Sequence, residues 1–239
     1  MQKITANAVG VKKALAALAV PKRQSDLERF FKTGPGEYGE GDIFIGVTVP
    51  QSRSVAKKFA SMSFEELQKL APSRIHQERF VAQLILLNYF EKSKLQKDRK
   101  FYFETWLSWL RAGHVNNWDL VDVVGSRIGS YLLDQTNPLT LLKKLAKSEN
   151  LWERRCAIIL TFPLIRAGRF GEALEISDIL IDDSHDLIHK AVGWMLREIG
   201  KRDVSVLRQF LADYAATMPR TALRYAIEKL PESERKRWL

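Results

Sequence analysis

Two tryptophans and one aspartate stand at positions where side chains of these types could form a working surface. Trp118 and Asp122 lie four residues apart, about one helical turn, and Trp194 lies in a segment rich in charge. An indole ring binds apolar and cationic groups through its face, and a carboxylate stabilises positive charge or accepts hydrogen bonds. We interpret Trp118, Asp122 and Trp194 as a ligand surface, although these residues alone do not name the ligand.

Helical projection places these side chains on faces that differ from the apolar face of each helix. One sector of about 60° on the helix from residue 116 holds Trp118, Asp122, Gly125 and Gly129. One sector of about 80° on the helix from residue 185 holds Asp186, Lys190, Gly193, Trp194 and Arg197. Glycine inside a helix costs roughly 1 kcal/mol relative to alanine, so these glycines indicate that something bulky approaches the backbone. Two interpretations stay open: a ligand at these faces, or tight helix packing with tryptophan in the core.

Other candidate groups are Arg155, two histidines and a glycine-rich loop. Arg155 projects with apolar residues, where a guanidinium needs a partner; a structural ion pair and a phosphate contact both fit. His185 and His189 are four residues apart but lack a third ligand, so we expect no metal site. The loop at residues 34–41 lacks the Lys-Ser/Thr ending of a phosphate-binding loop, and we expect no cofactor.

The composition indicates a globular protein with an excess of positive charge. Lysine and arginine number 38 against 28 aspartates and glutamates, which gives a net charge of +10 over 239 residues. That excess predicts attraction to a polyanion, either nucleic acid or an acidic membrane surface, or is simply solubilising charge. The one cysteine, Cys156, lies in an apolar run and is expected to be buried. No apolar run approaches the roughly 20 residues of a membrane span, and we expect a soluble, cytoplasmic protein without a membrane partner, associated with the nucleoid if it is bacterial.

The elements that must position these residues are helices. Ile43 to Val49 has some strand character, but no second strand follows to pair with it. Apolar residues recur three and four positions apart in segments near 50–60, 63–71, 75–92, 99–112, 116–133, 137–147, 151–166, 170–181, 185–199, 203–214 and 219–229. Helices that begin near residues 116, 151, 185 and 219 are spaced by about 34, and each follows a shorter amphipathic helix.

This period predicts an all-α fold, an α-solenoid of HEAT-like repeats that binds its partner on a concave face. We expect a single domain over residues 1–239. Within it, residues 1–49 would hold N-terminal helices and the glycine-rich loop, and residues 50–239 the helical repeats.

The chain resembles the AlkD-type DNA alkylation-repair glycosylases, which are built from HEAT-like repeats. Order and spacing agree from about residue 25 to the C-terminus. The matching segments are Phe44-Ile45-Gly46-Val47 with Pro50 and Arg53, Asn117-Trp118-Asp119-Leu120-Val121-Asp122, Trp152-Glu153-Arg154-Arg155, and Lys190 to Glu198 around Gly193-Trp194.

The resemblance implies a role for each residue at the surface. Asp122 corresponds to the catalytic carboxylate, Trp118 and Trp194 to the tryptophans beside the lesion, and Arg155 to the arginine that binds the DNA backbone. Lys190 and Arg197 are predicted to bind the backbone as well. Phe30 stands where the family pattern has a tyrosine, so an aromatic contact with the lesion or its sugar is kept and a hydroxyl is lost.

The function that the resemblance implies is that of a monomeric, monofunctional glycosylase. It would bind duplex DNA on a basic concave face and hydrolyse the glycosidic bond of cationic N3-methyladenine and N7-methylguanine without a cofactor or metal. The alternative is a non-catalytic HEAT-like protein that binds distorted or branched DNA. A third possibility is a helical scaffold for an acidic protein, which predicts no salt-sensitive affinity for DNA.

Overall fold

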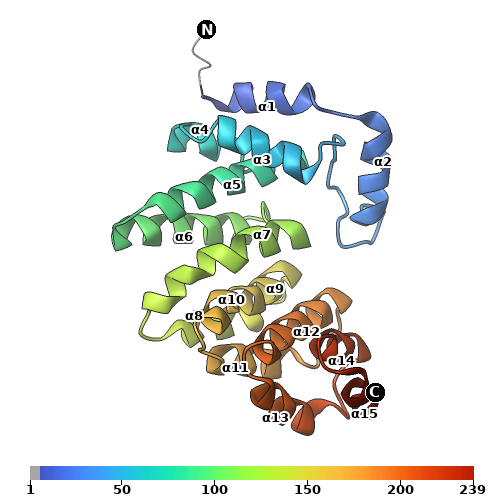
Figure 1. The fold of residues 1–239 in the computed structure, drawn as a ribbon. Coiled ribbons are helices and arrows are strands. Elements are labelled where there is room, and N and C mark those ends of the chain that lie inside the picture. The colour runs from blue at the N-terminus through green and yellow to red at the C-terminus, as the bar shows by residue number, and fades with distance from the viewer. Residues whose placement is uncertain (1–5) are drawn as a thin grey trace. The chain divides into compact units, whose positions relative to one another are not determined.

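Helices make up nearly all of the regular structure in the computed structural model, which describes residues 6–239 (Figure 1). Within these residues, the one β pairing is an isolated bridge between Ile43 and Ile75. The elements are α1 (Ala8–Ala16), α2 (Pro21–Phe30), α3 (Val49–Lys58), α4 (Phe64–Gln68), α5 (His76–Lys92), α6 (Gln96–Arg111), α7 (Trp118–Ile128), the 3-10 helix η1 (Gly129–Asp134), α8 (Pro138–Ala146), α9 (Leu151–Ile159), α10 (Phe162–Arg166), α11 (Gly171–Leu180), α12 (Asp186–Gly200), α13 (Val204–Tyr214), α14 (Arg220–Ile227) and α15 (Glu232–Trp238). The chain divides into two compact units, with the boundary between Leu120 and Val121 inside α7.

The first unit is built around α5. This helix packs against α1, α3, α4 and α6. Its side chains are buried on nearly every face, as Phe80, Ile85 and Leu86 illustrate. In contrast, α2 contributes no buried residue and lies on the surface of the unit. The first unit therefore has a central helix with α2 as a peripheral element.

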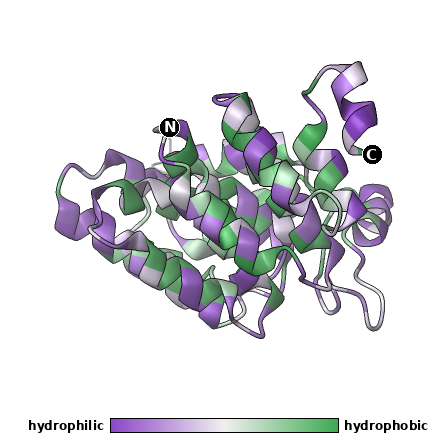
Figure 2. Cartoon of the chain, turned by 90° about the horizontal axis from the view of Figure 1, so that it is seen from below, coloured by the Kyte–Doolittle hydropathy of each residue, from purple (hydrophilic) through white to green (hydrophobic). Residues whose placement is uncertain are grey.

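The second unit consists of packed helix pairs. α8 packs on α9, α11 packs on α12, and both α13 and α14 pack on α12. α9 also packs on α12, which joins neighbouring pairs. Hydrophobic and hydrophilic residues are mixed along most helices, whereas α15 beside the C mark is mainly hydrophilic (Figure 2). Burial of one face of each helix against the next provides the core.

The predicted all-α fold is confirmed, and so is the period of its helices. α9, α12 and α14 begin at Leu151, Asp186 and Arg220, about 34 residues apart as expected. Cys156 is fully buried, also as expected. No helix among residues 6–239 is long and apolar enough to cross a membrane. The single-domain organisation and the concave basic face stay predictions.

Four details differ from the sequence-based prediction. The segment 116–133 is α7 followed by the 3-10 helix η1, so Gly129 begins η1 and does not belong to α7. The segment 151–166 is two helices, because Pro163 lacks an N–H and lies in the first turn of α10 instead of continuing α9. α15 had no predicted counterpart, because its seven residues are almost all polar and show no apolar period. The strand character of residues 43–49 produces only the bridge at Ile43.

Candidate functional site

Asp122 and Arg155 form a two-pronged ion pair in the second unit. Arg155 Nε donates to Asp122 Oδ1 at 2.8 Å, and Nη2 donates to Oδ2 at 2.7 Å. The Asp122 side chain is 15% exposed and that of Arg155 is 6% exposed. Parallel bonds from a planar guanidinium fix both the position and the plane of a carboxylate. Asp122 is thus a charged group held in one orientation near the surface.

Arg155 also bonds to the start of α12. Its Nη1 donates to the backbone carbonyl of Leu187, in the first turn of that helix. One side chain from α9 therefore ties α7 to α12, two helices that are far apart in sequence. Of the two partners predicted for Arg155, the structural ion pair is present, and a phosphate contact stays a prediction.

The start of α12 is organised by its own polar side chains. His185 caps the helix by accepting the N–H of Leu187 at Nδ1, 3.1 Å away. Burial lowers the pKa of His185, which favours the neutral ring that this bond requires. His189 Nε2 bonds to the carbonyl of Asp183. Among residues 6–239, no group of three metal-binding side chains occurs, so neither histidine belongs to such a cluster.

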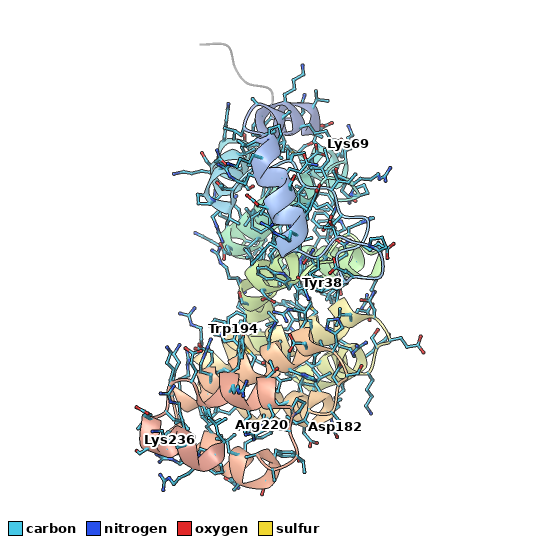
Figure 3. All side chains as sticks on the ribbon, turned by 90° about the vertical axis from the view of Figure 1, so that its right-hand side faces the viewer. Tyr38, Lys69, Asp182, Trp194, Arg220 and Lys236 are labelled. Carbon is cyan, nitrogen blue, oxygen red and sulfur yellow. The ribbon has the colours of Figure 1, made fainter. Side chains whose placement is uncertain are left out.

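Trp194 lies on α12 and is half-buried (Figure 3). Its ring centroid is 5.9 Å from that of Phe162, the first residue of α10. The guanidinium of Arg166 lies 6.0 Å from the Phe162 ring, and Arg166 is exposed. The indole therefore has one aromatic support and a cation close by, while part of its surface stays open to solvent. A ligand could use that open part.

The two predicted backbone-binding cations on α12 are engaged in ion pairs. Lys190 Nζ lies 2.6 Å from Asp186 Oδ2, and the hydrogen bond from Lys190 is the main cause of a lowered pKa at Asp186. Arg197 pairs with Glu228, which follows α14. Lys190 is 39% exposed and Arg197 is 19% exposed, so both pairs are accessible to solvent.

The glycines on these faces serve helix packing. A Cβ built at Gly129 would lie 2.6 Å from the carbonyl oxygen of Leu160, and one at Gly193 would lie 2.4 Å from that of Ala222. Gly125 is buried. The open interpretation of a ligand against the glycine backbone is therefore wrong for Gly129 and Gly193, where a neighbouring backbone fills the space. The packing alternative is confirmed at both positions.

Trp118 belongs to an aromatic group in the first unit. Its ring stacks on Phe31 at 5.1 Å between centroids with an interplanar angle of 14°, and Phe30 meets it edge-on at 5.8 Å. Phe30 is 63% exposed, whereas Phe31 is buried. The structure thus brings two predicted residues, Trp118 and Phe30, into contact, and Phe30 presents most of its ring to solvent.

Sequence reasoning missed two aromatic partners, Phe31 and Phe162. Phe162 lies in an apolar run that is typical of the core, Phe31 follows a mainly polar segment, and no local spacing connects either residue to a tryptophan. The one sequence signal for Phe31 is its position next to Phe30. Which of the two adjacent phenylalanines stacks on Trp118 depends on the turn that ends α2. That turn is shaped by Lys32, which has a φ of 51°.

The chain was compared with family models, solved structures and curated proteins. The family model described as DNA alkylation repair enzyme matches residues 11–230. Among solved structures, the chain is similar to a predicted DNA alkylation repair enzyme from Enterococcus faecalis. The TM-score is 0.70 at 18% identity, with 90% of this chain and 97% of that chain covered. At this identity the likeness shows the fold. No curated protein matches the chain.

Proposed function

The chain belongs to the family of DNA alkylation repair enzymes, and from that premise we propose that it is a DNA glycosylase for cationic alkylpurines. Its substrates would be N3-methyladenine and N7-methylguanine in duplex DNA. In these lesions the base carries a positive charge, and the bond from the sugar C1′ to the base nitrogen breaks with both electrons going to the base. The base leaves neutral, water adds to C1′ and loses a proton, and an abasic site remains.

The observation that carries the proposal is the fixed carboxylate of Asp122. The transition state of glycosidic cleavage resembles an oxocarbenium ion, with positive charge on the sugar. A carboxylate already oriented by two guanidinium bonds can stabilise that charge without reorganising at the moment of reaction. Asp122 can also accept a hydrogen bond from the attacking water. No acid is needed for the leaving group, because the departing base is already cationic.

Each tryptophan offers a contact that would be favourable to a cationic lesion. Trp118 lies four residues before Asp122 on α7, so one helix bears both the aromatic and the acidic group. Trp194 is half-open to solvent beside Phe162. An indole face attracts a cation with about 0.5–2 kcal/mol, depending on desolvation. Phe30, exposed beside Trp118, would offer an apolar contact to a lesion or its sugar.

The backbone of DNA would be bound by cations that already have weak partners. Lys190 and Arg197 pair with carboxylates at exposed sites, where an ion pair contributes about 0–1 kcal/mol. A phosphate can replace such a partner at little cost. Arg155 is far less exposed and is engaged by Asp122 and Leu187. We expect its main role to be the orientation of Asp122, with phosphate contact as a further prediction.

One observation favours the second candidate function, a non-catalytic protein that binds distorted or branched DNA. The Asp122–Arg155 pair also ties three helices together, and that role alone would need no chemistry. The two functions differ in product. We expect the wild-type protein to release N7-methylguanine and N3-methyladenine from methylated duplex DNA, as measured by chromatography of the free bases against a protein-free control. Tight binding to a branched junction, with release no faster than in the control, would support the second function instead.

A further inference from the structure

A buried cluster of charged side chains lies next to Trp118 in the first unit. His76, the first residue of α5, is 3% exposed and meets a carboxylate on each side. Its Nδ1 lies 2.8 Å from Asp42 Oδ2, and its Nε2 lies 2.9 Å from Asp119 Oδ2. Carboxylate oxygens are acceptors, so both ring nitrogens donate and the ring is an imidazolium. Arg79 adds a second cation by donating to Asp42.

The backbone around Trp118 is held on both sides by residues that bond to this cluster. Asn117 is fully buried, donates to Asp42 at 3.3 Å, and accepts the N–H of Trp118 at 2.9 Å. On the other side, Asp119 bonds to His76 through one oxygen and accepts the N–H of Leu120 through the other. The two residues that flank Trp118 in sequence, Asn117 and Asp119, are thus both hydrogen-bonded to the Asp42–His76 pair.

The ring of Trp118 reaches the same histidine through a stack of aromatic rings. Trp118 stacks on Phe31, and Phe31 stacks on Phe44 at 4.7 Å. Phe44 stacks on His76 at 4.4 Å with an interplanar angle of 24°. A cation over the face of a phenyl ring is favourable, which stabilises the contact between His76 and Phe44. His76 is therefore connected to Trp118 in two ways: through the hydrogen bonds of the flanking residues and through the stack of aromatic rings.

We propose that His76 is a positioning residue that, by bridging Asp42 and Asp119 and ending the aromatic stack, fixes the orientation of Trp118. A buried group of charges is often no more stabilising than apolar residues of the same volume, whereas it does specify one arrangement. What Trp118 then contacts, a damaged nucleotide, rests on the proposed function. The fixed orientation itself is a property of the protein without DNA.

The cluster is expected to respond to alkaline pH. Burial lowers the pKa of His76, but Asp119 and Asp42 outweigh it and raise that pKa to about 9. The bridge contributes its full stabilisation below the ordinary pKa of 6.5 and loses it as the pH rises through about 9. The other charged groups around the cluster are Arg79 and Glu78 of α5, His114 before α7, and Lys12 of α1, which pairs with Glu78.

The first experiment follows Trp118 in the DNA-free protein. Its accessibility is the difference in acrylamide quenching of tryptophan fluorescence between wild type and Trp118→Phe, measured from pH 6.5 to 10. We expect quenching of Trp118 to rise through about pH 9, because a neutral imidazole leaves one carboxylate without its hydrogen bond. Asp119→Asn should abolish this rise, since an amide can donate to the unprotonated Nε2. His114→Gln, a nearby control, should keep it.

The second experiment links the orientation to function. At pH 7, His76→Gln should lower the rate of N7-methylguanine release about 10- to 100-fold and leave the affinity for undamaged duplex unchanged. Asp119→Asn should retain most of the release rate. It is also the variant to measure if His76→Gln does not fold. A folded His76→Gln with wild-type quenching and release would overturn the proposal, as would a wild-type quenching curve that stays flat through pH 9. If wild type releases no base, the proposed function fails, and the quenching series still decides the role of His76.

Discussion

Phe30 and Phe31 are adjacent residues of the same type, yet they occupy opposite environments beside Trp118. Phe31 is 6% exposed and sits between the rings of Phe44 and Trp118, so it belongs to the core. Phe30 is 63% exposed and touches Trp118 only at its edge. At the residue scale, one phenylalanine supports the tryptophan, and the other is placed to meet a ligand.

This difference predicts that substitution of Phe31 mainly lowers stability, whereas substitution of Phe30 mainly lowers activity. Phe31→Ala should lower the free energy of unfolding by about 3–5 kcal/mol, because it removes a buried ring. Phe30→Ala should change that free energy by less than about 0.5 kcal/mol and still reduce base release. Urea denaturation and the release assay measure the two effects. A Phe30→Ala protein with undiminished release would remove Phe30 from the proposed site, and Phe30→Tyr tests whether a hydroxyl there extends the range of lesions.

At the element scale, two kinds of close contact hold α7, α9, α12 and α14 together. One is the side chain of Arg155, which bonds to Asp122 of α7 and to Leu187 of α12. The other is glycine, which lets backbones approach: Gly129 after α7 lies against Leu160, and Gly193 of α12 lies against α14. The catalytic carboxylate that we propose is therefore positioned by packing that depends on residues without side chains.

Alanine at these glycines should be costly because the added Cβ would meet backbone atoms, which cannot rotate away. We expect Gly129→Ala and Gly193→Ala each to lower the free energy of unfolding by about 1–3 kcal/mol. Gly171→Ala is the matched control, since a Cβ there meets nothing within 4 Å and alanine is the better helix former. Its unfolding free energy should stay equal or rise slightly. Equal stability of all three variants, measured by thermal or urea unfolding, would contradict the packing assigned to Gly129 and Gly193.

Much of the helical architecture could be predicted from apolar spacing, because each long helix buries one face and its sequence carries that period. The break between Ile159 and Phe162 was missed although Pro163 marks it, since the apolar pattern continues across the break. Asp122, Arg155 and the tryptophans could be singled out from their faces. The pairing of Asp122 with Arg155 could not, because a lone arginine fits a carboxylate and a phosphate equally well.

The group around His76 shows more clearly what a single sequence does not reveal. His76 is 34 residues from Asp42 and 43 residues from Asp119, and no helical period relates the three. Their meeting depends on how the loop before α3, the start of α5 and the start of α7 pack together. Asp119 in particular, three residues before Asp122, is buried against His76 and plays a structural part, although the sequence marks both simply as acidic.

At the scale of the whole molecule, the excess of positive charge sets how the chain meets DNA. With a net charge of +10, association should be driven largely by release of counterions from the phosphates. Raising the salt from 50 to 200 mM should weaken duplex affinity by about 10³-fold or more if six or more phosphates are contacted. Lys190→Ala and Arg197→Ala should each reduce the salt slope by about one. Affinity that does not depend on salt, measured by fluorescence anisotropy, would favour a scaffold for an acidic protein.

The central claim is that the carboxylate of Asp122 stabilises the sugar cation, and single-turnover release of N7-methylguanine tests it most directly. Asp122→Asn keeps the shape of the side chain and removes its charge, and Asp182→Asn, at an exposed position, is the matched control. Both proteins are first checked for folding and duplex affinity, since Asp122 also pairs with Arg155. We predict a loss of about 100-fold or more for Asp122→Asn and a wild-type rate for Asp182→Asn. Equal release by Asp122→Asn and wild type would contradict the account.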